Sequence, residues 1–248
     1  MSGHSKWATI KRKKGAADAA RGKLFAKLIR FIEVAAREGG GDPASNPTLA
    51  TAIQKARDAS MPMDNIDRAI KRATGDLAGV TYEEASYEGY APGGVAVYVT
   101  VLTDNRNRAA ADVRNAFTKN GGSLGEPGSV AWKFEKTGVI VVAAGGLDED
   151  AVLEAALDAG ADDVRAEGDT FEISTRPSEW MNVRKALEDG GLPIESAEVT
   201  MIPQQTTPVA ESRAAQVLRL VEALEDLDDV QDVYADFDIP EEVLAKLA

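Results

Sequence analysis

The stretch from residue 139 to residue 202 constrains the fold most, because it has the pattern of a complete domain within a longer chain. Its periodicity changes in the order strand, helix, strand, strand, helix, strand, which is the ferredoxin-like arrangement. The expected elements are residues 139–142, 148–159, 163–166, 170–174, 179–188 and 198–202. A helix at 212–225 and a strand at 230–237 follow, and such a pair cannot bury its apolar face alone. We therefore expect the pair to complete an earlier sheet, which makes the ferredoxin-like unit an insertion.

That earlier sheet is expected within residues 79–136. The pattern predicts strands at 86–90 and 95–102 and a helix at 106–119. Residues 129–135 alternate between apolar and polar and predict a half-buried strand. Three aromatic residues are expected in the core of these elements and of the later helix at 179–188, because burial is the ordinary fate of such side chains. They are Trp132, Phe134 and Trp180.

Residues 23–75 predict an entirely helical unit. Apolar residues recur at three- and four-residue spacing in three segments, which Gly-rich and Met61-Pro62 sequences separate. Asn46 and Asp64 are the expected N-caps of the second and third helices. The predicted fold class is therefore multi-domain α+β, with a helical N-terminal domain and two α/β domains, one of them ferredoxin-like and inserted into the other. The expected domains are residues 1–78, residues 79–136 together with 206–248, and residues 137–205.

The composition excludes several kinds of site. The 248 residues include no cysteine and a single histidine, His4, which excludes disulfides, thiolate metal centres and sites with several histidines. No stretch approaches the roughly 18 apolar residues of a membrane span, and the first residues lack the apolar core of a signal peptide. We therefore expect a cytoplasmic protein with no membrane contact, no cofactor and no bound metal.

The net charge of −13 is distributed unevenly along the chain. Residues 1–30 carry nine Lys and Arg against one Asp, and residues 31–75 are balanced with six of each sign. Residues 76–248 carry 13 basic against 34 acidic residues. Such asymmetry is typical of a basic arm for a polyanion attached to an acidic body.

Residues 1–22 predict an extended or partly ordered basic arm. Four consecutive cations neighbour a lysine and an aromatic residue, and together they form the strongest local signal for phosphate binding and base stacking. These residues are Lys6, Trp7, Lys11, Arg12, Lys13 and Lys14. The alternative is a solvated tail whose Trp7 packs against the helical domain.

Other basic residues are candidates to extend this surface. They lie at the end of the arm, on faces of the first and third helices, and around the start of the helix at 106–119, where free backbone amides favour anions. These candidates are Arg21, Lys23, Lys27, Arg30, Arg68, Lys71, Arg72, Arg106, Arg108 and Arg114. The alternative interpretation is solvated helix faces, and a capping loop in which Asp104 or Asn105 caps the helix.

Two acidic clusters raise the question of a metal-dependent nuclease. Residues 148–150 have the pattern of a helix N-terminus, where carboxylates interact well with the helix dipole. Residues 222–229 have the pattern of the outer face and exit of the helix at 212–225. Neither cluster has a motif for a two-metal site, so we expect no catalytic residue and no enzyme.

Three long segments resemble one known family. They are GHSKWATIKRKKGAADAARGKLFAKL (residues 3–28), MPMDNIDRAIKRATG (61–75) and YEGYAPGGVAVYVTVLTDNRNRAAADVRNAFTKNGGSLGEPGSVAWKF (87–134). Together they closely resemble the YebC/PmpR family, which includes the mitochondrial translational activator of cytochrome c oxidase. The resemblance implies a cytoplasmic protein of three domains. Some members are described as probable transcriptional regulators that bind promoter DNA, and others as translation factors that act on ribosomes stalled at proline runs.

These observations predict a non-enzymatic regulator, foremost a DNA-binding transcriptional regulator. The alternative is a translation factor that binds the ribosome or RNA and relieves stalling at proline runs, and a metal-dependent nuclease is the remote alternative. The expected partner is DNA or ribosomal RNA, bound through the basic N-terminal domain. The acidic domains are a possible surface for a protein partner.

Overall fold

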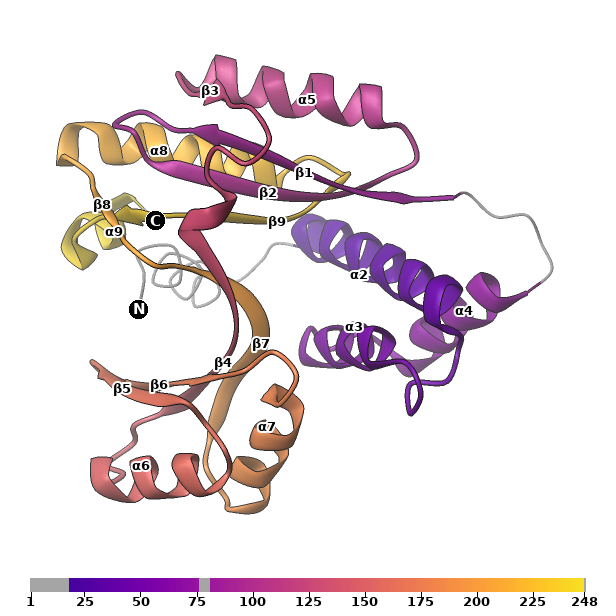
Figure 1. The fold of residues 1–248 in the computed structure, drawn as a ribbon, viewed down its shortest axis with the longest axis vertical. Helices are drawn as coiled ribbons and strands as arrows, with labels where there is room; N and C mark the ends of the chain where they lie inside the picture. The colour runs from indigo at the N-terminus through magenta and orange to yellow at the C-terminus, as the bar shows by residue number, and fades with distance from the viewer. Residues whose placement is uncertain (1–17, 76–80, 248) are drawn as a thin grey trace. The chain divides into compact units, whose positions relative to one another are not determined.

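The computed structural model describes residues 18–75 and 81–247 (Figure 1). Within these residues the chain divides into two units. One unit is Lys133–Gln204, and the other contains the chain on both sides of it. The chain therefore begins in the larger unit, forms the unit Lys133–Gln204 and then returns to the larger unit.

The N-terminal part of the larger unit is helical, as predicted. Its helices are α2 (Asp18–Gly39), α3 (Pro47–Asp58) and α4 (Met63–Thr74). Ile32, Leu49 and Ile66, one from each helix, are completely buried in their common core. The spacing in the first helix predicts that Leu24 shares the apolar face of Leu28 and Ile32, but Leu24 is 45% exposed, so that prediction is wrong.

Asn46 joins two of these helices. Its Oδ1 accepts a hydrogen bond from the Leu49 N–H, which confirms the predicted N-cap of α3. Its amide also donates to the carbonyls of Ala35 and Gly40 at the end of α2. The predicted cap of α4 is wrong: that helix begins at Met63, Pro62 occupies the cap position, and Asp64 lies inside the first turn.

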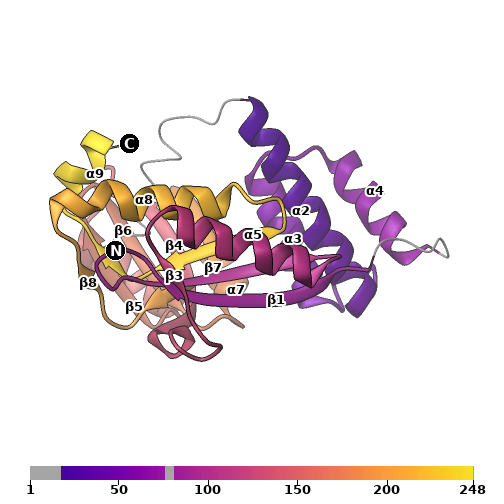
Figure 2. The same cartoon turned by 90° about the horizontal axis from the view of Figure 1, so that it is seen from above.

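The rest of the larger unit is an antiparallel sheet with the order β3-β1-β2-β9. Its strands are β1 (Glu83–Tyr90), β2 (Ala96–Thr103), β3 (Ser123–Leu124) and β9 (Val230–Ala235). Helices α5 (Arg106–Lys119) and α8 (Glu211–Glu225) lie together over one face (Figures 1 and 2). Because β9 pairs with β2, the predicted return of the late helix–strand pair is confirmed.

Three short elements complete this unit near the C-terminus. Strands β8 (Thr207–Pro208) and β10 (Phe237–Asp238) pair in parallel, and helix α9 (Glu241–Leu247) follows. Phe237, Ile239 and Leu244 bury their side chains in the same core as the sheet. The sequence pattern did not predict α9.

The unit Lys133–Gln204 has the ferredoxin-like topology. Its elements are β4 (Phe134–Ala143), α6 (Glu149–Asp158), β5 (Asp163–Glu167), β6 (Thr170–Thr175), α7 (Trp180–Asp189) and β7 (Ile194–Pro203). The strand order is β5-β6-β4-β7 and every neighbouring pair is antiparallel. The predicted α+β class with a helical N-terminal domain is confirmed.

The segment before β4 differs from the prediction. Residues 131–133 form the 3-10 helix η1 (Ala131–Lys133), and the strand begins only at Phe134. Phe134 and Trp180 are buried as expected, at 6% and 2% exposure. Trp132 is 68% exposed, so its predicted core position is wrong.

Candidate nucleic-acid interface

Residues 1–17 of the predicted basic arm lie outside the described residues, whereas residues 18–22 already belong to helix α2, so the helix starts five residues earlier than predicted. Six predicted contacts therefore have no structural account: Lys6, Trp7, Lys11, Arg12, Lys13 and Lys14. Of the remaining ten candidates, Arg21 is exposed near the start of α2.

The lysines on the basic side of α2 contact the turn that follows α8. We call residues 225–229 the acidic turn, since four of its five residues are Glu or Asp. Lys23 Nζ lies 3.2 Å from Asp226 Oδ1, in an exposed ion pair. Lys27 Nζ donates to the Glu225 carbonyl oxygen at 2.6 Å. Burial lowers the pKa of Lys27, although nearby carboxylates, Glu225 foremost, act in the opposite direction.

Arg30 is the most extensively bonded of the α2 cations. Its Nη1 donates to the carbonyls of Leu102 and Asp228, at 3.1 and 2.8 Å, and lies 3.2 Å from Asp229 Oδ1. Its guanidinium also lies over the Tyr82 ring, 5.0 Å from the centroid. All three acceptors face the same nitrogen, and together with the Tyr82 ring they fix the guanidinium beside the acidic turn.

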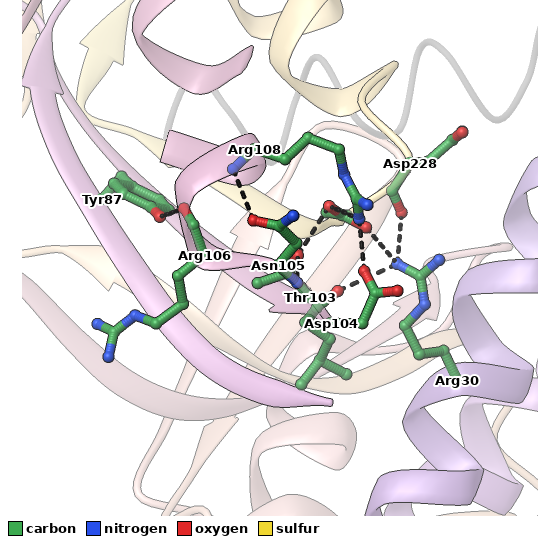
Figure 3. A network of polar contacts seen from close by, with 10 residues as sticks. Arg30, Tyr87, Thr103, Asp104, Asn105, Arg106, Arg108 and Asp228 are labelled. Atoms are coloured by element: carbon green, nitrogen blue, oxygen red, sulfur yellow. Dashed lines mark hydrogen bonds and ion pairs between the residues drawn. The ribbon is translucent and has the colours of Figure 1, made fainter. Parts of the chain in front are cut away.

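Asp229 connects Arg30 to Arg108 at the start of α5. Figure 3 shows Arg30, Asp104 and Arg108 in this network. Its Oδ2 accepts from Arg108 Nη2 at 2.8 Å and from Thr103 Oγ1 at 2.9 Å. Arg108 also bonds Asp104 at 2.6 Å. The Asp229 hydrogen bond, with that of Asp104, raises the pKa of Arg108, and the hydrogen bond from Arg108 lowers the pKa of Asp104.

The acidic turn therefore neutralises part of the predicted phosphate-binding set. Lys23, Lys27 and Arg30 join the helical part of the chain to the acidic turn, and Arg108 bonds the Asp229 carboxylate that Arg30 also contacts. The sequence indicated each charged segment but not their pairing. The only sign of this pairing in the sequence is that the basic face at residues 23–30 and the acidic run at 222–229 have similar lengths. The two segments lie near opposite ends of the chain.

Other candidate cations remain on exposed faces. Asn105 is the N-cap of α5, because its Oδ1 accepts from the Arg108 N–H at 3.1 Å. Arg106 and Arg114 are exposed on that helix. On α4, Lys71 is exposed, Arg68 bonds Asn65, and Arg72 pairs with Glu33 at 3.1 Å.

Glu88 is a buried carboxylate that sequence reasoning missed. Its side chain on β1 accepts the backbone N–H groups of Gly128, Val130 and Ala131 at 2.6, 2.6 and 2.8 Å. Burial disfavours its charge, but these three donors together hold the pKa of Glu88 below its ordinary value. Glu88 thereby fixes the loop that leads to η1.

Replacing Glu88 with Gln is expected to destabilise the fold by about 2–3 kcal/mol at pH 7, because the charge that accepts three N–H groups is lost. A lowered pKa in the folded state means that this stabilisation is complete above the ordinary value of 4.5 and disappears as pH falls below it. Unfolding midpoints measured from pH 7 downwards should therefore converge for the two proteins. Glu84→Gln, an exposed position on the same strand, is the control. A difference that stays constant through pH 4.5 and below would contradict this role.

The described residues show no metal centre. Within 18–75 and 81–247, no three His, Cys, Asp or Glu side chains lie close enough together to hold a metal ion. None of the helices in this part of the chain is long and apolar enough to cross a membrane.

Comparisons with known proteins cover nearly the whole chain. A family model described as the TACO1/YebC protein N-terminal domain matches residues 5–76, and one described as the TACO1/YebC second and third domain matches residues 82–237. Proteins from Rubrobacter xylanophilus and Syntrophobacter fumaroxidans are 61% and 57% identical over the full length of both chains, and each is named a probable transcriptional regulatory protein. The crystal structure of a conserved hypothetical protein, Aq1575 from Aquifex aeolicus, is similar with a TM-score of 0.79 and 51% identity. The match covers 90% of this chain and 92% of that one.

Proposed function

The chain belongs to the TACO1/YebC family, and from this premise we propose that it is a non-enzymatic regulatory protein that binds nucleic acid. The observation that carries the proposal is the segregation of charge. Residues 1–30 carry nine Lys and Arg, whereas residues 76–248 carry 13 basic against 34 acidic residues. A basic end on an acidic protein orients its encounter with a polyanion.

The proposed contacts fall into two groups. Lys27, Arg30 and Arg108 serve the contact with the acidic turn, so we assign them a positioning role. The proposed phosphate contacts are the arm and the exposed cations of α4 and α5. These are Lys6, Lys11, Arg12, Lys13, Lys14, Arg21, Arg68, Lys71, Arg72, Arg106 and Arg114.

Promoter DNA is the first candidate target, in accord with the names of the relatives. A translation factor that binds RNA or the ribosome is the second candidate. The observation that favours it is the exposed indole of Trp132, since duplex DNA offers no unpaired base on which an aromatic ring could stack. In either role, we propose that the protein acts in the cytoplasm and that its acidic domains face a protein partner.

To distinguish promoter DNA from the ribosome as the target, binding to each is measured in the same buffer at about 0.15 M salt. Binding to promoter fragments is compared with fragments of scrambled sequence, and co-sedimentation with purified ribosomes is measured in parallel. A transcriptional regulator should prefer the promoter sequence by about 1000-fold or more. Weak binding without sequence preference, together with firm association with ribosomes, would overturn the transcriptional role and support the translational one.

We also predict that the protein does not cleave nucleic acid. Incubation of branched and linear DNA and of RNA with the protein, in Mg²⁺ or Mn²⁺, should leave the substrates intact. Because trace nucleases contaminate many preparations, cleavage counts only if it follows the protein through two purification steps and needs the metal. Such cleavage would contradict the non-enzymatic assignment.

A further inference from the structure

Trp132 is the most exposed large apolar side chain in the described part of the chain. Its 68% exposure compares with 51% for Leu157, the next in order. Burial of an indole is among the largest contributions of a single side chain to the free energy of folding, and Trp132 does not make it. Tryptophan is among the residues most enriched in binding hot spots.

The local structure holds this indole in one position. Its Nε1–H donates to the Ser129 carbonyl at 3.2 Å, and the Tyr90 hydroxyl donates to the same carbonyl oxygen at 3.2 Å. The neighbouring Val130 is completely buried, and Glu88 binds the backbone N–H groups on both sides of Ser129. The ring therefore loses little conformational freedom when a ligand binds it.

The hydrogen bond also limits what the ring can recognise. Tryptophan has one polar donor, and here Ser129 accepts it, so the flat faces of the indole remain for a partner. A flat aromatic face stacks on a planar ring without regard to its hydrogen-bonding pattern. Bases inside a duplex are covered by their neighbours, whereas an unpaired base has a free face.

From this geometry we infer that Trp132 is a stacking platform for an unpaired nucleobase of RNA or single-stranded DNA. The inference rests on the proposed nucleic-acid function and adds a site to it. The arm would contact phosphates whatever the sequence of the nucleic acid and whether it is single- or double-stranded. Trp132 would add affinity for unpaired strands.

Tryptophan fluorescence provides a direct test, because the chain has only three tryptophans. In the full-length variant Trp7→Phe, Trp132 is exposed and Trp180 is 2% exposed, so quenching by acrylamide reports on Trp132. Poly(U), poly(dT) and a duplex of about 20 base pairs are titrated separately. Poly(U) or poly(dT) should quench the exposed tryptophan and shield it from acrylamide, and the duplex should do neither. Comparison of the two homopolymers shows whether the ribose hydroxyl contributes.

Affinity measurements complete the test. Trp132→Ala should weaken binding of the single strand about 5- to 150-fold and leave the duplex affinity unchanged. Trp132→Phe should retain most of the affinity, because phenylalanine still stacks. Met63→Ala, which removes another exposed apolar side chain (46%), should change neither. Since Trp132 is exposed, the variants should keep the wild-type circular dichroism spectrum and Tm.

Two outcomes would overturn the inference. One is unchanged single-strand affinity in Trp132→Ala with no quenching in Trp7→Phe. The other is loss of ribosome association in Trp132→Ala while poly(U) affinity persists, which would indicate a protein pocket for the ring. In both cases the proposed function stands if alanine at residues 11–14 weakens binding of the duplex. The proposed function itself is overturned if the wild-type protein binds no nucleic acid.

Discussion

Asp229→Ala is expected to destabilise the protein by about 2–3 kcal/mol, a loss as large as the one expected for Glu88→Gln. The Asp229 side chain is only 12% exposed and accepts hydrogen bonds from Arg30, Arg108 and Thr103. Its removal leaves two guanidinium groups without their shared carboxylate. Thr103, which is completely buried, loses the acceptor of its hydroxyl as well. Denaturant midpoints followed by circular dichroism measure the effect.

Asp226→Ala is the matched control for this prediction. Asp226 belongs to the same acidic turn and pairs with a cation of the same helix, but its side chain is 76% exposed. Exposed pairs of this kind contribute little, so the change should stay within about 0.5 kcal/mol. Equal effects of the two substitutions would show that the turn contributes only general electrostatic attraction, and that Asp229 has no special role in holding α2.

The largest effect on binding is expected from alanine at Lys11, Arg12, Lys13 and Lys14 together. Loss of four phosphate contacts should weaken binding to a short duplex on the order of 100-fold at about 0.15 M salt, and should reduce the log–log salt slope by about 3 to 4. Because the sequence pattern predicts an arm outside the core at these residues, the Tm should change little. Fluorescence anisotropy with a labelled duplex at several salt concentrations measures both quantities.

The control must remove the same charge from another place. Alanine at Lys136, Arg165, Lys185 and Lys246, all exposed, makes the net charge more negative by the same four units. If general repulsion by the acidic body limited binding, both quadruple variants would lose the same affinity. We expect a much smaller loss of affinity for the control variant. Equal losses would remove the arm from the proposed site.

Much of the fold could be predicted because local pattern and global packing agree. The helix Arg106–Lys119 was predicted to the residue, and the ferredoxin-like order of elements was read from alternating periods. The pairing of β9 with β2 followed from the need of α8 and β9 to bury their apolar faces. These are consequences of short-range periodicity and of a shared core.

The strand predicted at residues 129–135 is absent at its start because of a tertiary contact. Its alternation is genuine, but the Glu88 carboxylate binds the N–H groups of Val130 and Ala131, which a strand would use for its ladder. The chain turns there, and Trp132 faces solvent instead of the core. A carboxylate 42 residues earlier in the chain decides this, and no local pattern contains that information.

The candidate site was predicted less completely than the fold. Basic side chains on a helix have the same spacing whether they face solvent, a phosphate or a carboxylate. Only the packing of α2 against the acidic turn distinguishes Arg30, which is engaged there, from Lys71, which is exposed. Charge counts along the sequence therefore predict the kind of partner better than they predict the contacts.

The salt dependence of nucleic-acid affinity shows whether the basic arm binds phosphates. We expect the wild-type protein to bind a duplex with a log–log slope of about −5 between about 50 and 200 mM salt, because about six cations displace counterions from phosphates. A slope near zero, or no measurable binding at the lowest salt concentration, would contradict this expectation.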